Sequence, residues 1–229
     1  MNVFSAWLVH LYTATGAIVA FFGVTAVLAG RYRASFLCMV AATAIDATDG
    51  VLARYARVRE QLPAVDGNRL DDIVDYLTYV FLPMLLVFHA GALPAGWGVV
   101  VVSVVLVSSL LGFAATDAKT SDHFFTGFPS YWNIVVLYLY AGQLSPVTNA
   151  IVLLLLSALV FWRVRYVYPT RTPTLRGLTL TLGTLWGVAI VAMILVLPDV
   201  PAALYFGSLL FPLYYFALSL TLHLRGSGA

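Results

Sequence analysis

The sequence predicts an all-α fold, a polytopic bundle of about eight transmembrane helices. Hydrophobic residues make up 62% of the 229 positions and charged residues only 10%, and the mean hydropathy is +0.94. Soluble domains carry roughly 25% charged residues, so this composition argues against that class. The apolar residues also form long uncharged runs, and about 20 apolar residues in a helix are enough to cross a bilayer.

The uncharged runs divide at Gly, Pro and Arg, and each run is a candidate span. We place the spans near residues 5–29, 33–56, 68–90, 96–116, 131–142, 147–165, 177–197 and 202–222. The first run follows no basic segment and precedes no small-residue cleavage site, so we expect residues 4–29 to be a retained span and not a signal peptide. Without long charge runs or low-complexity tracts, residues 1–229 are expected to form a single membrane domain.

The net charge and the cysteine content limit which molecules the chain is expected to bind and which covalent links it can form. The formal net charge is only +2, which argues against nucleic acid as a partner. Cys38 is the lone cysteine, so the chain contains no intrachain disulfide, and we expect Cys38 to be a small core residue. Membrane lipids are therefore the expected surroundings.

Small residues recur at helical spacing in two of the spans. The first span carries Gly16, Ala20, Gly23 and Gly30, and the seventh carries Gly183 and Gly187. Small residues let the backbones of two membrane helices approach closely. Both stripes are expected to be packing surfaces.

Five of the ten acidic residues lie in the apolar second and third spans: Asp46, Asp49, Asp71, Asp72 and Asp75. A charge in such sequence is costly and indicates a functional site. Asp46 and Asp49 lie about 60° apart on one helix, and Asp71 and Asp75 lie about 40° apart on the next, so each pair shares a face. The polar segment between the spans allows them to run antiparallel, which would bring the two carboxylate faces together.

Four converging carboxylates repel one another unless protons or a divalent cation hold them together. Because the ligands would be oxygens alone, with no cysteine or histidine close in the sequence, they favour Mg²⁺ or Mn²⁺ over Zn²⁺. Gly50, Ala53 and Gly67 remove side-chain bulk from the same region, which leaves room for a large ligand.

These residues resemble the signature of the CDP-alcohol phosphatidyltransferase family. The pattern is Asp46-x2-Asp49-Gly50-x2-Ala53-Arg54 followed by Gly67-x3-Asp71-x3-Asp75, and every signature position is filled. The spacer from Tyr55 to Asp66 has twelve residues, longer than is usual in the family. That departure resembles the branch formed by the bacterial phosphatidylcholine synthases, whose acceptor is choline.

The resemblance implies a reaction: transfer of the phosphatidyl group of CDP-diacylglycerol to choline, with release of CMP and a requirement for Mn²⁺ or Mg²⁺. It implies that Asp46, Asp49 and Asp71 are metal ligands and that Asp75 is the general base and also touches the metal. Space for the CDP group would come from Gly50, Ala53 and Gly67, and Arg54 would orient an aspartate or a phosphate. Asp72 lies about 100° from Asp71 and is left outside the metal site.

The loop of residues 117–133 is polar and aromatic, and two interpretations stay open. Lys119 could meet a phosphate, while the aromatic residues could anchor the membrane interface or surround the ammonium group of choline. The rings of the loop are Phe124, Phe125, Phe128, Tyr131 and Trp132. For choline we select Tyr131, Trp132 and Phe128, together with Tyr76 from the third span.

A second loop concentrates arginines: Arg163, Arg165, Arg171 and Arg176. Such a group is a cytoplasmic positive patch, or it grips phosphate through bidentate guanidinium contacts. Under the second interpretation Arg163, Arg165 and Arg171 would bind the lipid phosphates.

The distribution of basic residues predicts the orientation in the membrane. If the segment from Arg54 to Arg69 is cytoplasmic, alternation of the spans leaves only Arg31 and Arg33 outside, among twelve Lys and Arg residues. This obeys the positive-inside rule. We therefore expect an integral protein of a bacterial inner membrane, with its active site facing the cytoplasm.

Alternatives to this reaction stay open at the level of the sequence. The acceptor could be serine, glycerol phosphate or an inositol phosphate, although the aromatic loop favours choline. An ion-coupled transporter could use the same aspartates as a relay, but the acids cluster near one face and no inverted repeat is visible. A homodimer is left open as an assembly.

Overall fold

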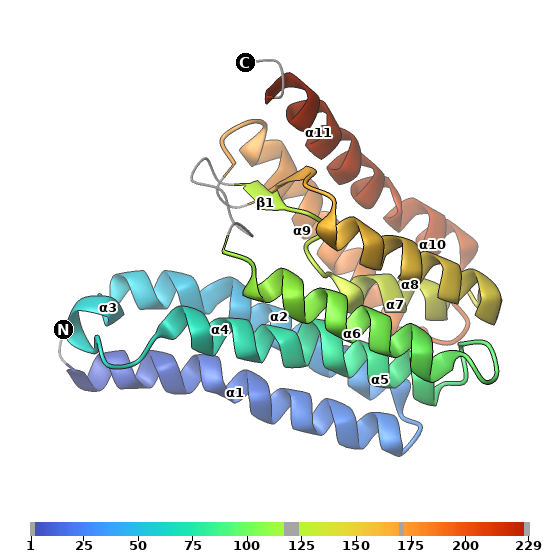
Figure 1. Cartoon of the computed structure of the whole chain (residues 1–229), viewed down its shortest axis with the longest axis horizontal. Helices are drawn as coiled ribbons and strands as arrows, with labels where there is room; N and C mark the ends of the chain where they lie inside the picture. Colours follow the sequence, from blue (N-terminus) through green and yellow to red (C-terminus); the bar gives the residue numbers. More distant parts are fainter. Residues whose placement is uncertain (1–2, 117–123, 170–171, 227–229) are drawn as a thin grey trace. The chain divides into compact units, whose positions relative to one another are not determined.

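The computed structural model describes residues 3–116, 124–169 and 172–226, and Figure 1 shows their course. This part of the chain is helical except for one two-stranded sheet and the connecting segments. It divides into two compact units, unit 1 from Met1 to Ala90 and unit 2 from Gly91 to Ala229. The single domain expected from the sequence stays a prediction.

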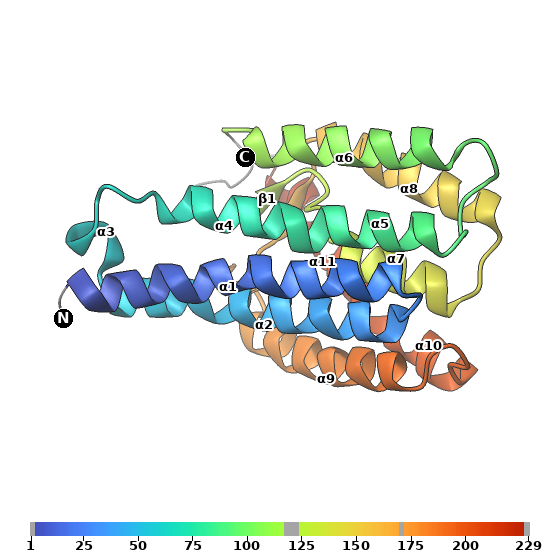
Figure 2. The ribbon, with the colours of Figure 1, turned by 90° about the horizontal axis from the view of Figure 1, so that it is seen from below.

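Unit 1 is built from three long helical runs. They are α1 (Val3–Leu28), α2 (Tyr32–Tyr55) and an unbroken run of α4 (Gly67–Asp75), the π-helix η1 (Tyr76–Phe81) and α5 (Leu82–His89), with the short α3 (Val58–Gln61) between α2 and α4. Helix α1 packs along α2 and along the run from α4 to α5, as Figures 1 and 2 show. Because the turn at Gly30 reverses the chain, α1 and α2 are antiparallel.

A proline explains the π-helix inside the third run. Pro83 has no backbone N–H, and in an α-helix its ring would clash with the carbonyl of the residue four positions earlier, Tyr79. The turn before Pro83 widens instead, and the N–H of Leu82 donates to the carbonyl of Leu77, five residues back. The widened segment begins directly after Asp75.

Gly16, Ala20 and Gly23 of the small-residue stripe form a packing surface on α1, as predicted, whereas Gly30 lies in the turn after the helix and a Cβ atom there would meet nothing within 4 Å. A Cβ atom added at Gly16 would collide with Val74 Cγ1, and one added at Gly23 would lie 2.5 Å from Leu82 Cδ2. Ala20, between them, is buried. The missing side chains therefore let α1 approach the third run closely.

Unit 2 holds the remaining helices and the sheet. The helices are α6 (Gly98–Ala114), α7 (Trp132–Ala141), α8 (Pro146–Phe161), α9 (Arg176–Leu195), α10 (Ala202–Ser208) and α11 (Leu210–Gly226). Helix α6 packs against α8, and α9 contacts both α10 and α11. Tyr138 ties α7 to two other helices, since its hydroxyl accepts from Trp186 Nε1 at 3.0 Å and donates to Ser208 Oγ at 2.9 Å.

The sheet joins two segments that the sequence analysis treated only as loops. Strands β1 (Phe124–Thr126) and β2 (Arg165–Val167) pair antiparallel, with Phe124 opposite Val167 and Thr126 opposite Arg165. Gly127 follows β1 with φ +80°, and a Cβ atom there would collide with the carbonyl oxygen of Val160. Only glycine fits this close approach, so it helps to fix the end of the strand.

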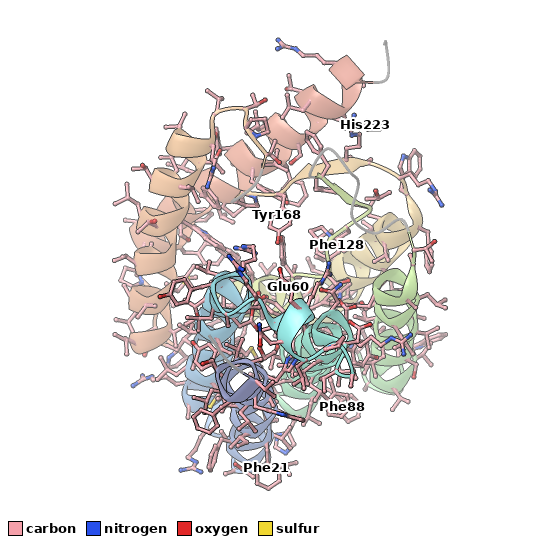
Figure 3. All side chains as sticks on the ribbon, turned by 90° about the vertical axis from the view of Figure 1, so that its left-hand side faces the viewer. Phe21, Glu60, Phe88, Phe128, Tyr168 and His223 are labelled. Carbon is pink, nitrogen blue, oxygen red and sulfur yellow. The ribbon has the colours of Figure 1, made fainter. Side chains whose placement is uncertain are left out.

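Helices occur in all eight regions where spans were predicted. Among the described residues four helices are long and apolar enough to cross a membrane, namely Val3–Leu28, Tyr32–Tyr55, Arg176–Leu195 and Ala202–Arg225. Their outward faces are apolar; the ring of Phe21, for example, is 65% exposed and points away from unit 1 in Figure 3. The polytopic helical class is therefore supported with four candidate spans, and the number eight is not confirmed.

Candidate active site

Three of the predicted metal ligands come together in unit 1. Asp46 and Asp49 on α2 and Asp71 on α4 each offer one carboxylate oxygen, and these oxygens all lie within 4.8 Å of one another. Asp49 is buried, and the other two are half-buried. The expected meeting of the two carboxylate faces is thus observed for these three residues.

Asp75, the fourth predicted ligand, is not part of this group of three. It ends α4 one turn beyond Asp71, at the start of the π-helix. Asp75 therefore lies beside the three-carboxylate group and not within it.

The start of α4 fixes where Asp71 lies on the helix. Asp66 is the N-cap, and its Oδ1 accepts from the backbone N–H groups of Asn68 at 3.0 Å and Arg69 at 3.4 Å. Such a cap contributes about 1 kcal/mol to a helix. Because the helix begins at Gly67, Asp71 lies little more than one turn inside it.

Two hydroxyl groups hold the carboxylates in place. Thr13 Oγ1 on α1 donates to Asp49 Oδ2 at 2.8 Å, and the Tyr79 hydroxyl donates to Asp46 Oδ2 at 2.8 Å. Both donors are buried. Two of the three carboxylates, those of Asp49 and Asp46, are thus oriented from α1 and from the π-helix, as well as by their own helix.

Sequence reasoning did not select Thr13 or Tyr79 for the site. Thr13 had a signal, since it is a polar residue on the buried face of α1 that also carries Ala6, Gly16 and Ala20. The sequence signal for Tyr79 was weaker. The π-helix shifts the residues after Asp75 away from regular α-helical spacing, so helical periodicity does not place Tyr79 on the face of the aspartates.

The small residues of the signature have distinct neighbours. A Cβ atom at Gly50 would lie 3.3 Å from Arg54 Nη1, so the glycine leaves room for the arginine on its own helix. A Cβ atom at Gly67 would lie 3.0 Å from Cε1 of His10. Ala53 is half-buried against the cluster of Ala6, Ala56 and Val58. At Gly67 the space left by the missing side chain therefore adjoins the His10 ring.

The aromatic residues selected for choline lie in different surroundings. Trp132 is fully buried, donates from Nε1 to Ser109 Oγ at 2.7 Å and packs edge-on against Phe128 with ring centroids 5.0 Å apart. Tyr131 is half-buried and packs against the cluster of Tyr166, Val167 and Tyr215. Tyr76, in unit 1, is half-buried at the first position of the π-helix.

The basic candidates lie at the sheet of unit 2 or beyond the described residues. The guanidinium carbon of Arg165 lies 4.4 Å from the centroid of the Phe124 ring, which is a cation–π contact across the two strands. The backbone N–H of Arg165 donates to Nδ1 of His223, which Figure 3 labels on α11. Arg163 is exposed. Lys119 and Arg171 lie outside the described residues.

Comparison with known proteins finds relatives that share a name. The chain is 43% identical over 169 residues to the phosphatidylcholine synthase of Legionella pneumophila, a match that covers 73% of this chain and 66%, just under two thirds, of that protein. It is 37% identical over 186 residues to that of Pseudomonas aeruginosa, with 81% and 78% covered. It is 34% identical over 219 residues to that of Rhizobium meliloti, with 96% and 91% covered. No protein-family model matches the chain.

Proposed function

The chain belongs to the bacterial phosphatidylcholine synthases, a branch of the CDP-alcohol phosphatidyltransferases, and from that premise we propose that it transfers the phosphatidyl group of CDP-diacylglycerol to choline and releases CMP. One observation carries this proposal: Asp46, Asp49 and Asp71 bring oxygens within 4.8 Å of one another at the signature positions of that family. Carboxylates so close in an apolar protein repel one another, and a bound cation or added protons relieve that repulsion.

The three carboxylates fit a divalent ion. Each bond between Mg²⁺ and an oxygen is about 2.1 Å long, so oxygens that would share one such ion lie no more than about 4.2 Å apart. The aspartate oxygens all lie within 4.8 Å of one another, which is close to that limit. We propose that Asp46, Asp49 and Asp71 hold Mg²⁺ or Mn²⁺. When bound, such an ion neutralises the diphosphate and stabilises charge on the departing CMP.

The donors around the carboxylates set their orientation. Thr13 and Tyr79 each donate to one carboxylate, Asp49 and Asp46 respectively, and so limit the rotation of those side chains. Groups that orient metal ligands in this way typically change metal affinity by about 10–100-fold when they are removed. Both hydroxyls are therefore proposed as positioning groups of the site.

Asp75 is proposed as the general base. As the choline oxygen attacks the phosphatidyl phosphorus, a new P–O bond forms, the P–O bond to CMP breaks, and the hydroxyl proton passes to the Asp75 carboxylate. A residue one turn from Asp71 is close enough to serve an acceptor bound beside the diphosphate. Asp75 could also contact the metal from this position.

The choline site follows from the size of choline. Its hydroxyl and its quaternary ammonium belong to one small molecule, so the rings that bind the ammonium must lie near the base. Tyr76 follows Asp75 directly in the chain and is half-buried, which supports it as a first contact. Tyr131, Phe128 and Trp132 stay proposed contacts, and the burial of the last two argues for a packing role. Lys119, Arg163, Arg165 and Arg171 stay proposed contacts of lipid phosphate.

We also propose how many helices cross the membrane and which way the protein is oriented in it. Each of the eight helical regions is proposed as a span of one membrane domain, with the carboxylates facing the cytoplasm of a bacterial cell. Within unit 1, Arg31 and Arg33 start α2, whereas Arg54 and Arg69 lie toward the opposite ends of the antiparallel helices. That separation supports the positive-inside orientation. A homodimer is kept as a proposal.

The test is an acceptor screen with purified protein. CDP-diacylglycerol labelled in the cytidine is supplied with choline, serine, glycerol phosphate or an inositol phosphate, and CMP release is measured beside lipid product. We expect CMP and phosphatidylcholine in equal amounts with choline, and neither with the Asp49→Asn variant. Preference for another acceptor would overturn the assignment of choline, and absence of CMP with every acceptor would overturn the transferase.

A further inference from the structure

His10 on α1 carries a buried polar atom for which the described residues offer no partner. The side chain is 5% exposed, and its Nε2 is buried without a hydrogen bond. Most buried polar side-chain atoms have a partner, and each exception needs a cause. An imidazole nitrogen in this position indicates a partner that is not part of the polypeptide.

The neighbours of His10 locate it within unit 1. On the same face of α1, Ala6 packs against Ala56 and Val58, and Thr13 bonds to Asp49. His10 lies between them, three residues or about 4.5 Å along the helix from Thr13. Its ring approaches the first residue of α4, since Cε1 lies 3.0 Å from where a Cβ atom of Gly67 would be.

The ring therefore lies one turn from the carboxylates, on the side of the helix ends that lead into residues 56–66. Any side chain at position 67 would press on it. An apolar residue at position 10 would fill the same space without leaving a polar atom unpaired. The combination of a buried histidine, its unpartnered Nε2 and the glycine beside it indicates binding and not packing alone.

We propose that Nε2 of His10 forms a hydrogen bond with the nucleoside half of the CDP group, an inference that rests on the proposed function. The diphosphate must lie at the carboxylates, and the acyl chains must lie among apolar residues. The polar nucleoside then extends toward the helix ends near residues 56–66, past His10. Imidazole donates or accepts according to its tautomer, so it can pair with a ribose hydroxyl or with the base.

The experiment compares three variants of the full-length protein in detergent with Mn²⁺ in excess. His10→Phe keeps a ring and removes Nε2, and His10→Gln places an amide nitrogen near the same point. His89→Gln is the matched control, because His89 lies at the other end of the unit 1 helices and its Nδ1 is 3.1 Å from the Tyr32 hydroxyl. The probes are CMP and inorganic pyrophosphate, each as a competitor of CDP-diacylglycerol.

We expect His10→Phe to raise the inhibition constant of CMP and the KM of CDP-diacylglycerol about tenfold, the loss typical of one hydrogen bond in a buried site. The inhibition constant of pyrophosphate and the KM of choline should stay unchanged, because neither ligand contains the nucleoside. His10→Gln should recover most of the affinity for CMP. His89→Gln should match the wild type.

A structural role for His10 would change the result. In that case His10→Phe would weaken the binding of CMP and of pyrophosphate equally, or it would lower only the thermal stability of the protein. Either outcome would overturn the inference. If His10→Phe does not fold, His10→Gln and His10→Asn decide: CMP affinity unchanged in both would refute the contact, and a loss with Asn alone would support it.

Direct binding of labelled CMP without choline separates this inference from the proposed function. If the wild-type protein binds CMP through His10 but does not use choline as a substrate, only the assignment of choline as the acceptor is contradicted. A wild-type protein that makes phosphatidylcholine while both His10 variants bind CMP normally would contradict the inference alone.

Discussion

The carboxylate group of unit 1 and the aromatic and arginine segments of unit 2 carry their polar side chains in different ways. In unit 1 the side chains project from regular helices, at spacings of three and four residues. In unit 2 they lie on a sheet of two three-residue strands, on the segments that adjoin it and at the first residues of two helices. Helical spacing allows the arrangement in unit 1 to be predicted from the sequence. The arrangement in unit 2 depends on a strand pairing between residues about 40 positions apart.

The two regions also differ in how their polar groups are satisfied. The buried aromatic groups of unit 2 bond to protein atoms: Trp132 donates to Ser109, and the Tyr215 hydroxyl donates to the carbonyl of Val167 at 2.9 Å. Unit 1 gathers three carboxylates and leaves Nε2 of His10 without a partner among the described residues. Carboxylates that repel one another are stabilised by a bound cation or by protons, so the gathering of three of them supports the proposal that the chemistry takes place in unit 1.

The largest effects should come from the aspartates, and they should differ in kind. Asp75→Asn should lower kcat by about 10²–10⁴-fold, the range for loss of a general base, while CMP still binds. Asp49→Asn should lose turnover and also weaken CMP, because the diphosphate would lose its metal. Initial rates and CMP binding measured on both variants check this. Near-normal transfer by Asp75→Asn would remove it as the base.

Removing the positioning hydroxyls should have the next largest effect. Thr13→Val and Tyr79→Phe should each raise the Mn²⁺ concentration that gives half-maximal activity, by about 10–100-fold. Thr25→Val is the control, since among the described hydrogen bonds the Thr25 hydroxyl donates only to the carbonyl of Phe22 on the same helix. Metal titrations that coincide for Thr13→Val and the control would show that Thr13 does not orient Asp49.

Glycine variants test whether close packing holds the unit 1 site together. Gly16→Ala would press into Val74, and overpacking of this kind costs about 1–3 kcal/mol. Gly187→Ala in α9 meets nothing within 4 Å and should be neutral or slightly stabilising, by about 0.5–1 kcal/mol. Thermal unfolding in detergent should separate the two. Equal stabilities would mean that α1 can move away from the third run at little cost.

The smallest effects should come from the aromatic candidates. A cation–π contact contributes about 0.5–2 kcal/mol, so Tyr76→Ala or Tyr131→Ala should raise the KM of choline by up to about thirtyfold and leave that of CDP-diacylglycerol nearly unchanged. Trp132→Ala should act mainly on stability, because the ring is fully buried. If the KM of choline is unchanged in both Tyr76→Ala and Tyr131→Ala, the two rings serve packing and the membrane interface instead.

The sequence predicts the helices and the acidic site well because both depend on local spacing. Asp46, Asp49 and Asp71 follow from helical periodicity, and Gly16 and Gly23 follow from the small-residue stripe. No short sequence pattern around Phe124 or Val167 indicates that these two residues pair. The widened turn that begins at Tyr76 could be traced to Pro83 only after the structure was known. The partners Thr13 and His10 come from a different helix, and a linear pattern does not connect them to the aspartates.

Binding of Mn²⁺ tests the central claim most directly, because it requires neither substrate nor turnover. Electron paramagnetic resonance of the purified protein with added Mn²⁺ should show bound ion in the wild type, loss of binding in Asp49→Asn, and unchanged binding in the unit 2 variant Arg165→Gln. Equal Mn²⁺ binding by wild type and Asp49→Asn, together with full turnover in excess chelator, would contradict a metal held by the carboxylates of unit 1.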